Sequence, residues 1–171
     1  GRVPCAIVAT SGTTTTTAFD PLDRIAAVGR AHGLWLHVDA AMAGSAMILP
    51  ECRDLWHGVE EADSLVLNAH KWLGVAFDCS LYYVRDPQHL VRVMSTNPSY
   101  LQSPVDSQVR NLRDWGIPLG RRFRALKLWW VIRAFGVDGV RARIAEHCAL
   151  AARLASWIEA DSRFELLAPV Q

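Results

Sequence analysis

Four short apolar runs recur along the first half of the chain, and their order constrains the fold more than any other feature. They cover residues 4–9, 34–38, 64–67 and 79–84. The first run is apolar without alternation, as strands buried in a parallel sheet require. Between the first two runs, Asp20 and Pro21 predict the start of a helix, and Gly33 predicts its end. Strands that alternate with helices in this way predict an α/β fold with a mainly parallel sheet.

The character of the chain changes near residue 95. A polar loop occupies residues 95–114, too long for a simple connector and typical of a functional or mobile segment. A strongly apolar helix is predicted over residues 120–135, and Gly136 breaks it. Apolar residues three and four positions apart then predict an amphipathic helix over residues 137–158.

Arg121 and Arg122 stand at the predicted start of the first of these helices. Positive charge is unfavourable there, because the helix dipole already places partial positive charge at the N-terminus. We therefore expect a charged partner to compensate them, such as a carboxylate across a subunit interface.

Composition excludes several classes of protein. The chain is 51% hydrophobic and 20% charged, which is typical of an ordered globular protein. Its net charge of +1 gives no reason to expect nucleic acid or an anionic membrane as a partner. The four cysteines are far apart in apolar surroundings, which favours buried free thiols in a reducing compartment. No apolar run is long enough to span a bilayer, so we expect a soluble, cytoplasmic protein.

Lys71 is the first candidate functional residue, and it is one of only two lysines among 18 basic residues. Apolar residues flank it at 65–67 and 72–77. Burial would favour the neutral amine, a nucleophile that can form a Schiff base. A lysine at a strand end whose amine reaches solvent explains the same pattern.

Two further polar sites follow predicted strands, namely residues 13–17 and Asp39. Ligands bind outside the carboxyl ends of the strands in open parallel sheets. Three interpretations remain open: an ion pair between Asp39 and Lys71, a metal site that uses His37, Asp39 and His70, or a pyridoxal phosphate site. The metal set lacks a recognised ligand spacing. Pyridoxal phosphate accounts for both groups, since Lys71 would form the imine and Asp39 would hold the protonated ring nitrogen.

Five motifs in one order carry a resemblance to a known family. They are His-Val-Asp-Ala-Ala at 37–41, Asn-Ala-His-Lys-Trp at 68–72, Gly-Thr-Thr-Thr at 12–15, Phe-Asp-Cys-Ser at 77–80 and the run from Trp to Arg at 115–124. The chain thereby resembles the group II pyridoxal phosphate-dependent decarboxylases, most closely their aromatic L-amino acid decarboxylase branch. The resemblance implies part of a fold-type I large domain with a mainly parallel sheet, followed by helices that lead into a C-terminal α/β domain.

The resemblance also implies domain boundaries. Residues 1–94 would be the C-terminal part of the cofactor domain, 95–114 a mobile catalytic loop, 115–135 a linking helix, and 136–171 the start of the C-terminal small domain. Because the strand-like pattern begins at once and the initial residue is not Met, we expect a fragment of a longer protein.

Site roles follow from the matched motifs. Lys71 would bind pyridoxal 5'-phosphate covalently, and Asp39 would pair with its pyridine nitrogen. The resemblance implies that the other cofactor-binding residues are Thr14 near the substrate carboxylate, Ala41 against the ring, and Asn68 and His70 around the phosphate. Tyr100, in the motif at 97–101, would return a proton to Cα after CO2 leaves.

The implied function is decarboxylation of an aromatic L-amino acid to its amine and CO2 by a homodimer. Relatives with phenylalanine in place of Tyr100 make aldehydes, so Tyr100 favours simple decarboxylation. Met42 departs from the aromatic residue of many relatives, which leaves the substrate preference open. The alternatives are an aromatic aldehyde synthase, a decarboxylase of acidic amino acids, or a partial domain that is catalytically silent by itself.

Overall fold

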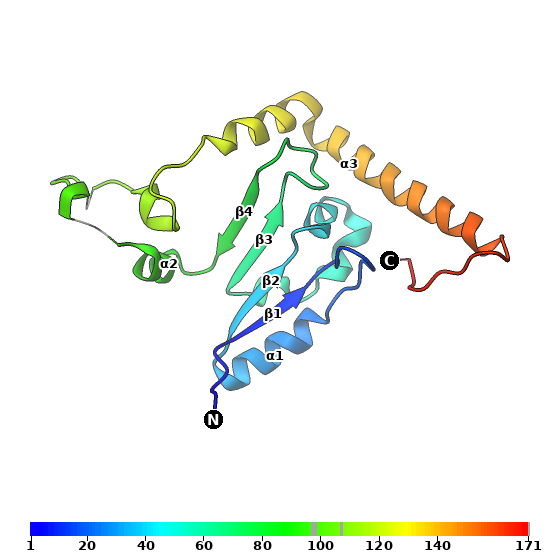
Figure 1. Cartoon of the computed structure of the whole chain (residues 1–171), viewed down its shortest axis with the longest axis horizontal. Coiled ribbons are helices and arrows are strands. Elements are labelled where there is room, and N and C mark those ends of the chain that lie inside the picture. The colour runs from blue at the N-terminus through cyan, green and yellow to red at the C-terminus, as the bar shows by residue number, and fades with distance from the viewer. Residues whose placement is uncertain (97–98, 107, 171) are drawn as a thin grey trace.

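The computed structural model describes residues 1–96, 99–106 and 108–170. A four-stranded sheet in the order β1–β2–β3–β4 organises it (Figure 1). The strands are β1 (Ala6–Thr10), β2 (Trp35–Asp39), β3 (Ser64–Asn68) and β4 (Ser80–Val84). The first three are parallel, and β4 runs antiparallel to β3. The prediction of a mainly parallel sheet is confirmed.

Helix α1 (Leu22–His32) connects β1 to β2 and covers one face of the sheet. Its Leu22 and Ala26 are buried against the β2 side chains of Leu36 and Val38. Gly33 ends the helix in the left-handed conformation, as predicted. The predicted N-cap is wrong, because Asp20 makes no capping bond to the helix. Its Oδ2 instead accepts the backbone N–H of Thr10 at 2.8 Å and fastens the end of β1.

The opposite face of the sheet is only partly covered. Strand alternation places Val8, His37 and Ser64 on this face, where they are paired in register. His89 packs on Trp35 of β2 with ring centroids 5.1 Å apart, whereas Val8 is 65% exposed and Tyr82 of β4 is 50% exposed.

Three short 3-10 helices connect β2 to β3, at Ala43–Ile48, Pro50–Trp56 and Val59–Glu61. Beyond β4 comes helix α2 (Pro87–Met94), which Asp86 caps by accepting two backbone N–H groups. Two further 3-10 helices, Ser99–Leu101 and Leu112–Trp115, lie in the expected loop region. Figure 1 shows this region beside α2 and apart from the β3–β4 connection.

Helix α3 (Arg124–Glu159) is one element with a break at Gly136, where φ is 66° and ψ is 178°. The predicted break is confirmed, but the helix begins at Arg124 rather than at 120. Its first half packs Leu128 and Val131 onto the β3–β4 connection, and its second half buries Ile144 against the segment that follows β2.

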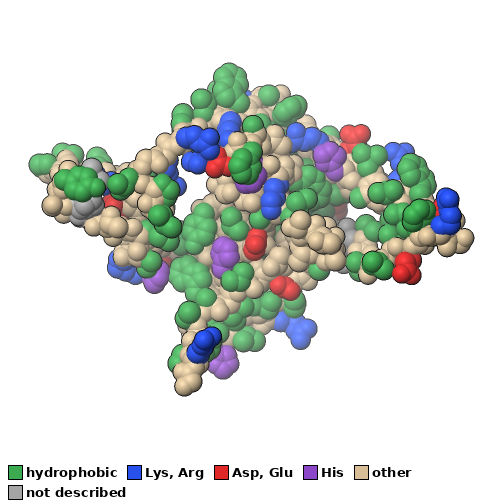
Figure 2. Space-filling model, in the orientation of Figure 1, with side chains coloured by type: hydrophobic (Ala, Val, Ile, Leu, Met, Phe, Trp, Pro, Cys, Tyr) green, Lys and Arg blue, Asp and Glu red, His purple; other side chains and the backbone are tan. Residues whose placement is uncertain are grey.

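Many apolar side chains of α3 remain exposed, as Figure 2 shows along the helix. Residues 164–167, whose pattern Phe-Glu-Leu-Leu resembles a strand, form no strand in the described structure. The prediction of four buried thiols is wrong, because only Cys79 is buried and Cys5 is exposed. Within the described residues, no helix is long and apolar enough to cross a membrane.

Candidate active site at the carboxyl edge of the sheet

Lys71 lies in the connection between β3 and β4, and hydrogen-bonded turns fix its backbone. Its N–H donates to the Asn68 carbonyl at 3.0 Å, and its own carbonyl accepts the Gly74 N–H at 3.1 Å. The side chain is exposed, as expected of a lysine at a strand end whose amine reaches solvent, despite its apolar flanks. Those flanks turn inward instead, since Leu73 and Val75 pack into the cores beneath α3. The Lys71 amine makes no hydrogen bond or ion pair to any described residue.

Asp39 ends β2 and is half-buried beside the Lys71 turn. Its Oδ1 accepts the Ala41 N–H at 3.0 Å, and the Ala41 carbonyl accepts the Asn68 N–H at 3.2 Å. The backbone of Ala41 therefore ties the carboxylate to the segment that carries the lysine. Asp39 and Lys71 form no ion pair with each other in the described structure, so the ion-pair interpretation is wrong.

His70 is held by the backbone of Cys79 at two points. Its N–H donates to the Cys79 carbonyl at 3.1 Å, and its ring Nδ1 lies 3.0 Å from the Cys79 nitrogen and 2.9 Å from the Cys79 oxygen. One ring nitrogen cannot accept and donate at once. Because the buried Cys79 amide must donate, we assign Nδ1 as the acceptor. The proton of the neutral ring then sits on Nε2.

The threonine loop approaches Asp39 from β1. Ser11 donates its backbone N–H to the Asp39 carbonyl at 2.9 Å, which carries the loop to the same edge of the sheet. Gly12 follows with φ 82°, packed so closely on Ala43 that a Cβ at Gly12 would lie 2.2 Å from that of Ala43. Thr13 and Thr16 share a hydroxyl hydrogen bond of 2.8 Å that closes the turn around Thr14. Thr14 itself is exposed at the tip.

Tyr100 is not brought to this edge. It is 76% exposed in the segment beside α2, and among the described residues Tyr100 makes no hydrogen bond to the Lys71 turn. Two other members of its motif, Asn97 and Pro98, lie outside the described residues. The role of Tyr100 therefore stays a prediction.

His37 serves the sheet rather than a metal site. Its Nδ1 lies 2.8 Å from the Ser64 hydroxyl, which also accepts the indole N–H of Trp35 at 2.9 Å. Burial lowers the pKa of His37, and the nearby Asp39 carboxylate opposes that shift. In the part of the chain that the structure describes, no group of three or more His, Cys, Asp or Glu residues could hold a metal ion.

Asp78 was missed as a functional candidate, although it belongs to one of the five motifs. Its carboxylate binds Arg122 and Arg124, and the Arg124 bond is the main cause that lowers the Asp78 pKa. The expectation for the arginine pair is thus corrected. Arg122 precedes α3 rather than opening it, and its partner lies in the same chain. The sequence clue that could have identified Asp78 was its place as the acidic residue of the 77–80 motif.

The residues gathered here fit pyridoxal phosphate. Among the described residues, Asp39 Oδ2 has no hydrogen-bond partner, so it is available to a protonated ring nitrogen. The unpaired Lys71 amine is available to an aldehyde. The Asn68 side-chain amide and the His70 Nε2–H can donate to phosphate oxygens.

Comparisons with known proteins agree with this chemistry. The model of the pyridoxal-dependent decarboxylase conserved domain matches residues 1–171. Aromatic-L-amino-acid decarboxylase of Drosophila melanogaster is 49% identical over 170 residues, which cover 99% of this chain and 33% of that protein. Tryptophan decarboxylase 2 of Oryza sativa subsp. japonica is 47% identical over 171 residues, covering 99% of this chain and 34% of that protein. The chain therefore spans about a third of the length of these relatives.

Solved structures show the same backbone. The crystal structure of Oryza sativa TDC with PLP and tryptamine has a TM-score of 0.94 and 42% sequence identity, covering 99% of this chain and 35% of that chain. Mouse CSAD has a TM-score of 0.90 and 38% identity, covering 99% and 35%. The expected fold is thereby confirmed. On these matches and on the chemistry of its site, the chain belongs to the pyridoxal-dependent decarboxylase family.

Proposed function

We propose that this chain carries the cofactor-binding edge of an enzyme that decarboxylates an aromatic L-amino acid to its amine and CO2. The observation that carries the proposal is the unpaired Asp39 carboxylate and Lys71 amine, tied to one edge of the sheet through Ala41. Because the Asp39 carboxylate and the Lys71 amine form no ion pair with each other, each is available to bind a different part of one cofactor. The names of the relatives favour an aromatic substrate.

Each residue has a defined task in this proposal. Lys71 would hold the cofactor covalently through Nζ, because its amine is free to react with the cofactor's aldehyde. Asp39 keeps a proton on the pyridine nitrogen, and the Ala41 N–H fixes its carboxylate by binding Oδ1. Asn68 and His70 bind the phosphate, while Ala41 and Thr14 border the ring and the substrate. When bound, pyridoxal phosphate supplies an electron-accepting ring that stabilises the negative charge left on Cα as CO2 departs.

Tyr100 completes the reaction by donating its phenol proton to Cα. For this step the segment at 95–114 must leave its position beside α2 and close over the substrate, which would also exclude water. Tyr100→Phe is expected to bind substrate but to form aldehyde in place of much of the amine. Clean amine at the original rate would remove Tyr100 from the mechanism.

The first experiment is an absorbance spectrum of the full-length protein before and after borohydride, followed by peptide mapping. We expect a visible band that borohydride abolishes and a reduced adduct on Lys71. Lys71→Ala should lose both, whereas Lys127→Ala, which removes the only other lysine of the chain, should keep both. A colourless wild-type protein, or an adduct that persists in Lys71→Ala, would contradict the assignment.

A panel of amino acids tests the substrate class. We expect amine from L-tryptophan, L-tyrosine or L-DOPA and none from L-glutamate. Preferred turnover of an acidic substrate would favour the alternative of a decarboxylase of acidic amino acids. Aldehyde as the main product would favour the alternative represented by Rhodiola rosea 4-hydroxyphenylacetaldehyde synthase, 37% identical.

Two further properties belong to the proposal. We expect the active protein to be a homodimer, which is supported by the large exposed side chains of Trp129, Trp130 and Trp157 along α3. Light scattering of the full-length protein measures this directly. A cytoplasmic location rests on the four free cysteines, and fractionation tests it. A catalytically silent partial domain remains the alternative for the isolated 171-residue chain, and a cofactor titration of that chain tests it.

A further inference from the structure

We propose that Asp78 is a positioning residue of this site, whose carboxylate joins the Lys71 turn to the segment that enters α3. The inference rests on the proposed function only in that the turn is taken to carry the cofactor lysine. Among the described residues, the Asp78 side chain makes no hydrogen bond or ion pair to Lys71. It acts through Cys79 and His70 on one side and through two arginines on the other.

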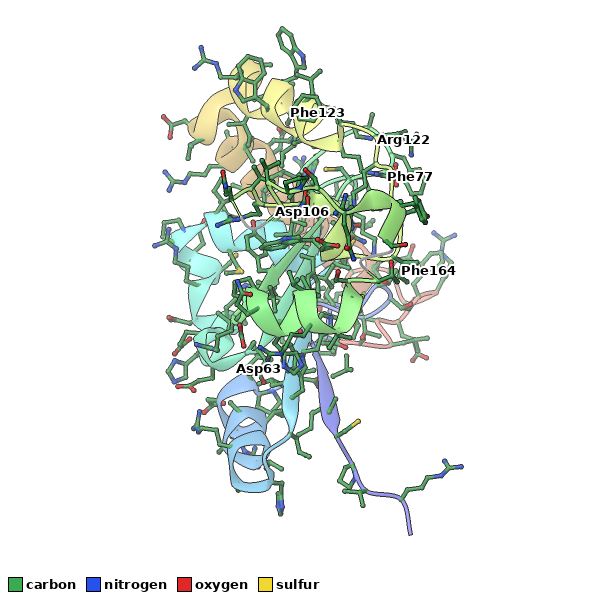
Figure 3. The ribbon with its side chains drawn as sticks, turned by 90° about the vertical axis from the view of Figure 1, so that its left-hand side faces the viewer. Asp63, Phe77, Asp106, Arg122, Phe123 and Phe164 are labelled. Atoms are coloured by element: carbon green, nitrogen blue, oxygen red, sulfur yellow. The ribbon has the colours of Figure 1, made fainter. Side chains whose placement is uncertain are left out.

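Both oxygens of the Asp78 carboxylate are engaged. Oδ2 accepts the Arg124 Nε and lies 3.0 Å from it, and Nη2 of the same guanidinium is also 3.0 Å away. Oδ1 accepts from Arg122. Figure 3 shows Arg122 beside Phe77, the neighbour of Asp78, so the approach to α3 lies directly against the segment that follows the lysine turn. The Asp78 side chain therefore binds two arginines that lie 44 and 46 residues further along the chain.

On the side of the lysine turn, Asp78 sets the position of Cys79. The Cys79 backbone holds both the N–H and the ring Nδ1 of His70, the residue before Lys71. The Cys79 thiol also lies 3.9 Å from the carbonyl of Arg124. Movement of residues 78 and 79 would free the His70 ring to rotate and to exchange its tautomer. Asp78 thus fixes which His70 nitrogen presents a proton at the site.

On the other side, the carboxylate secures the beginning of α3. Arg124 is the first helical residue, where the helix dipole disfavours positive charge, and Asp78 supplies the negative charge that compensates it. Leu128 and Val131 follow on the same helix and pack against the β3–β4 connection. The 95–114 segment enters this helix through residues 115–123, so the same contact anchors its downstream end.

Exposure separates this cluster from an ordinary surface ion pair. Exposed pairs contribute little because water screens them and side-chain entropy opposes them. The Arg122 side chain is 72% exposed and fits that description, but Asp78 and Arg124 are 29% and 36% exposed. The Arg124 contact is therefore expected to carry most of the effect. A role confined to anchoring the helix would leave the His70 ring unchanged, which makes that ring the informative probe.

The test compares Asp78→Asn with Asp161→Asn in the full-length protein. Asp161 is the control, since its carboxylate is likewise bound to arginine, here Arg163 alone through several contacts, but it follows the far end of α3. The ring nitrogens of His70 are observed by 15N NMR without cofactor, and kcat, KM and borohydride trapping on Lys71 are measured with it. We expect a single Nε2–H tautomer in wild type and Asp161→Asn, and a mixture in Asp78→Asn.

In the kinetic assay, Asp78→Asn should lower kcat by roughly 10- to 100-fold, because small displacements of positioned groups have effects of this size. KM and trapping on Lys71 should change little. Asp78→Glu, which keeps the charge, should recover part of the rate. Equal behaviour of Asp78→Asn and Asp161→Asn in both assays overturns the inference, as does a full kinetic loss with the His70 tautomer unchanged.

The design also covers two other cases, a variant that does not fold and a wrong assignment of the cofactor lysine. If Asp78→Asn does not fold, Arg124→Lys takes its place, since lysine keeps the charge but lacks the planar guanidinium that reaches Oδ2 through two nitrogens. It should shift the tautomer in the same direction by a smaller amount, and an unchanged tautomer overturns the inference. Absence of a Lys71 adduct in wild type would instead refute the proposed function, while the NMR comparison would still test Asp78.

Discussion

Replacement of Gly12 by alanine tests how the threonine loop is held against the Asp39 segment. Gly12 has φ 82°, and a Cβ there would lie 2.2 Å from the Cβ of Ala43. Two costs therefore add. The left-handed backbone costs an L-residue about 1–2 kcal/mol, and the steric overlap costs about 1–3 kcal/mol, as overpacking of a filled core does. We expect Gly12→Ala to lower the free energy of unfolding by about 2–5 kcal/mol.

Matched variants separate the two costs. Gly33 also has a positive φ, 62°, but nothing lies within 4 Å of a Cβ built there. Gly33→Ala should therefore cost only the backbone part, about 1–2 kcal/mol. In an Ala43→Gly background the overlap disappears, because the remaining Ala43 backbone atoms lie 3.4 and 3.5 Å from the new Cβ. There Gly12→Ala should also cost only the backbone part.

Denaturant unfolding of the wild type and the four variants, with a cofactor titration of each, provides the assay. Gly12→Ala should also weaken cofactor binding, since the clash pushes the loop that carries Thr14 away from Asp39, whereas Gly33→Ala should not. Equal destabilisation by Gly12→Ala and Gly33→Ala would refute the reasoning. So would a Gly12→Ala cost that is the same with and without the Ala43 methyl group.

Three other variants probe separate parts of the fold by denaturant unfolding. Ile144→Ala should cost about 3–4 kcal/mol because Ile144 is fully buried, whereas Leu154→Ala, 54% exposed on the same helix, should cost less than about 1 kcal/mol; equal costs would contradict the docking of α3. Asp20→Ala should cost about 1–2 kcal/mol through the lost Thr10 bond without reducing helix content, so a loss of helical circular dichroism would count against that assignment. Bonding to Arg124 lowers the Asp78 pKa from 3.8, so the stability that this carboxylate adds is present above about pH 4 and is lost as pH falls through the lowered pKa. The stability difference between wild type and Asp78→Asn should follow that course, and a difference that does not decline as pH falls below about 4 would exclude the carboxylate as its source.

The sequence predicted correctly those elements of the fold that depend on residues close together in the chain. The four apolar runs became the four strands, and Gly33 and Gly136 end or break helices because their backbones adopt φ values that favour glycine. The start of α1 was predicted wrongly, although Asp20 followed by Pro21 is a common N-terminal pattern. Thr10 competes for the same carboxylate, and that contact depends on how β1 meets the following loop.

The site was predictable to the extent that topology controls it. Parallel strands deliver Asp39 and the lysine turn to one edge, so their proximity follows from the strand order. The sequence left open whether Lys71 is buried or reaches solvent, because its apolar neighbours pack beneath α3 only after that distant helix has docked. Nor was Asp78 identifiable as the partner of Arg122, since the two lie 44 residues apart and meet only after α3 has docked.

Because the chain is synthesised from its N-terminus, the docking of α3 also has a consequence during translation. Its second half supplies Arg141 to the Ile48 carbonyl, Arg143 to the Leu73 carbonyl and His147 to the Trp72 indole, across separations of 93, 70 and 75 residues. At about 5–20 residues per second, the ribosome makes these partners roughly 4–19 s after the groups they cover. During that interval the apolar residues next to the lysine turn remain exposed to solvent on the nascent chain. A chaperone that binds exposed apolar segments would find its best opportunity there, and slower translation of α3 should increase aggregation.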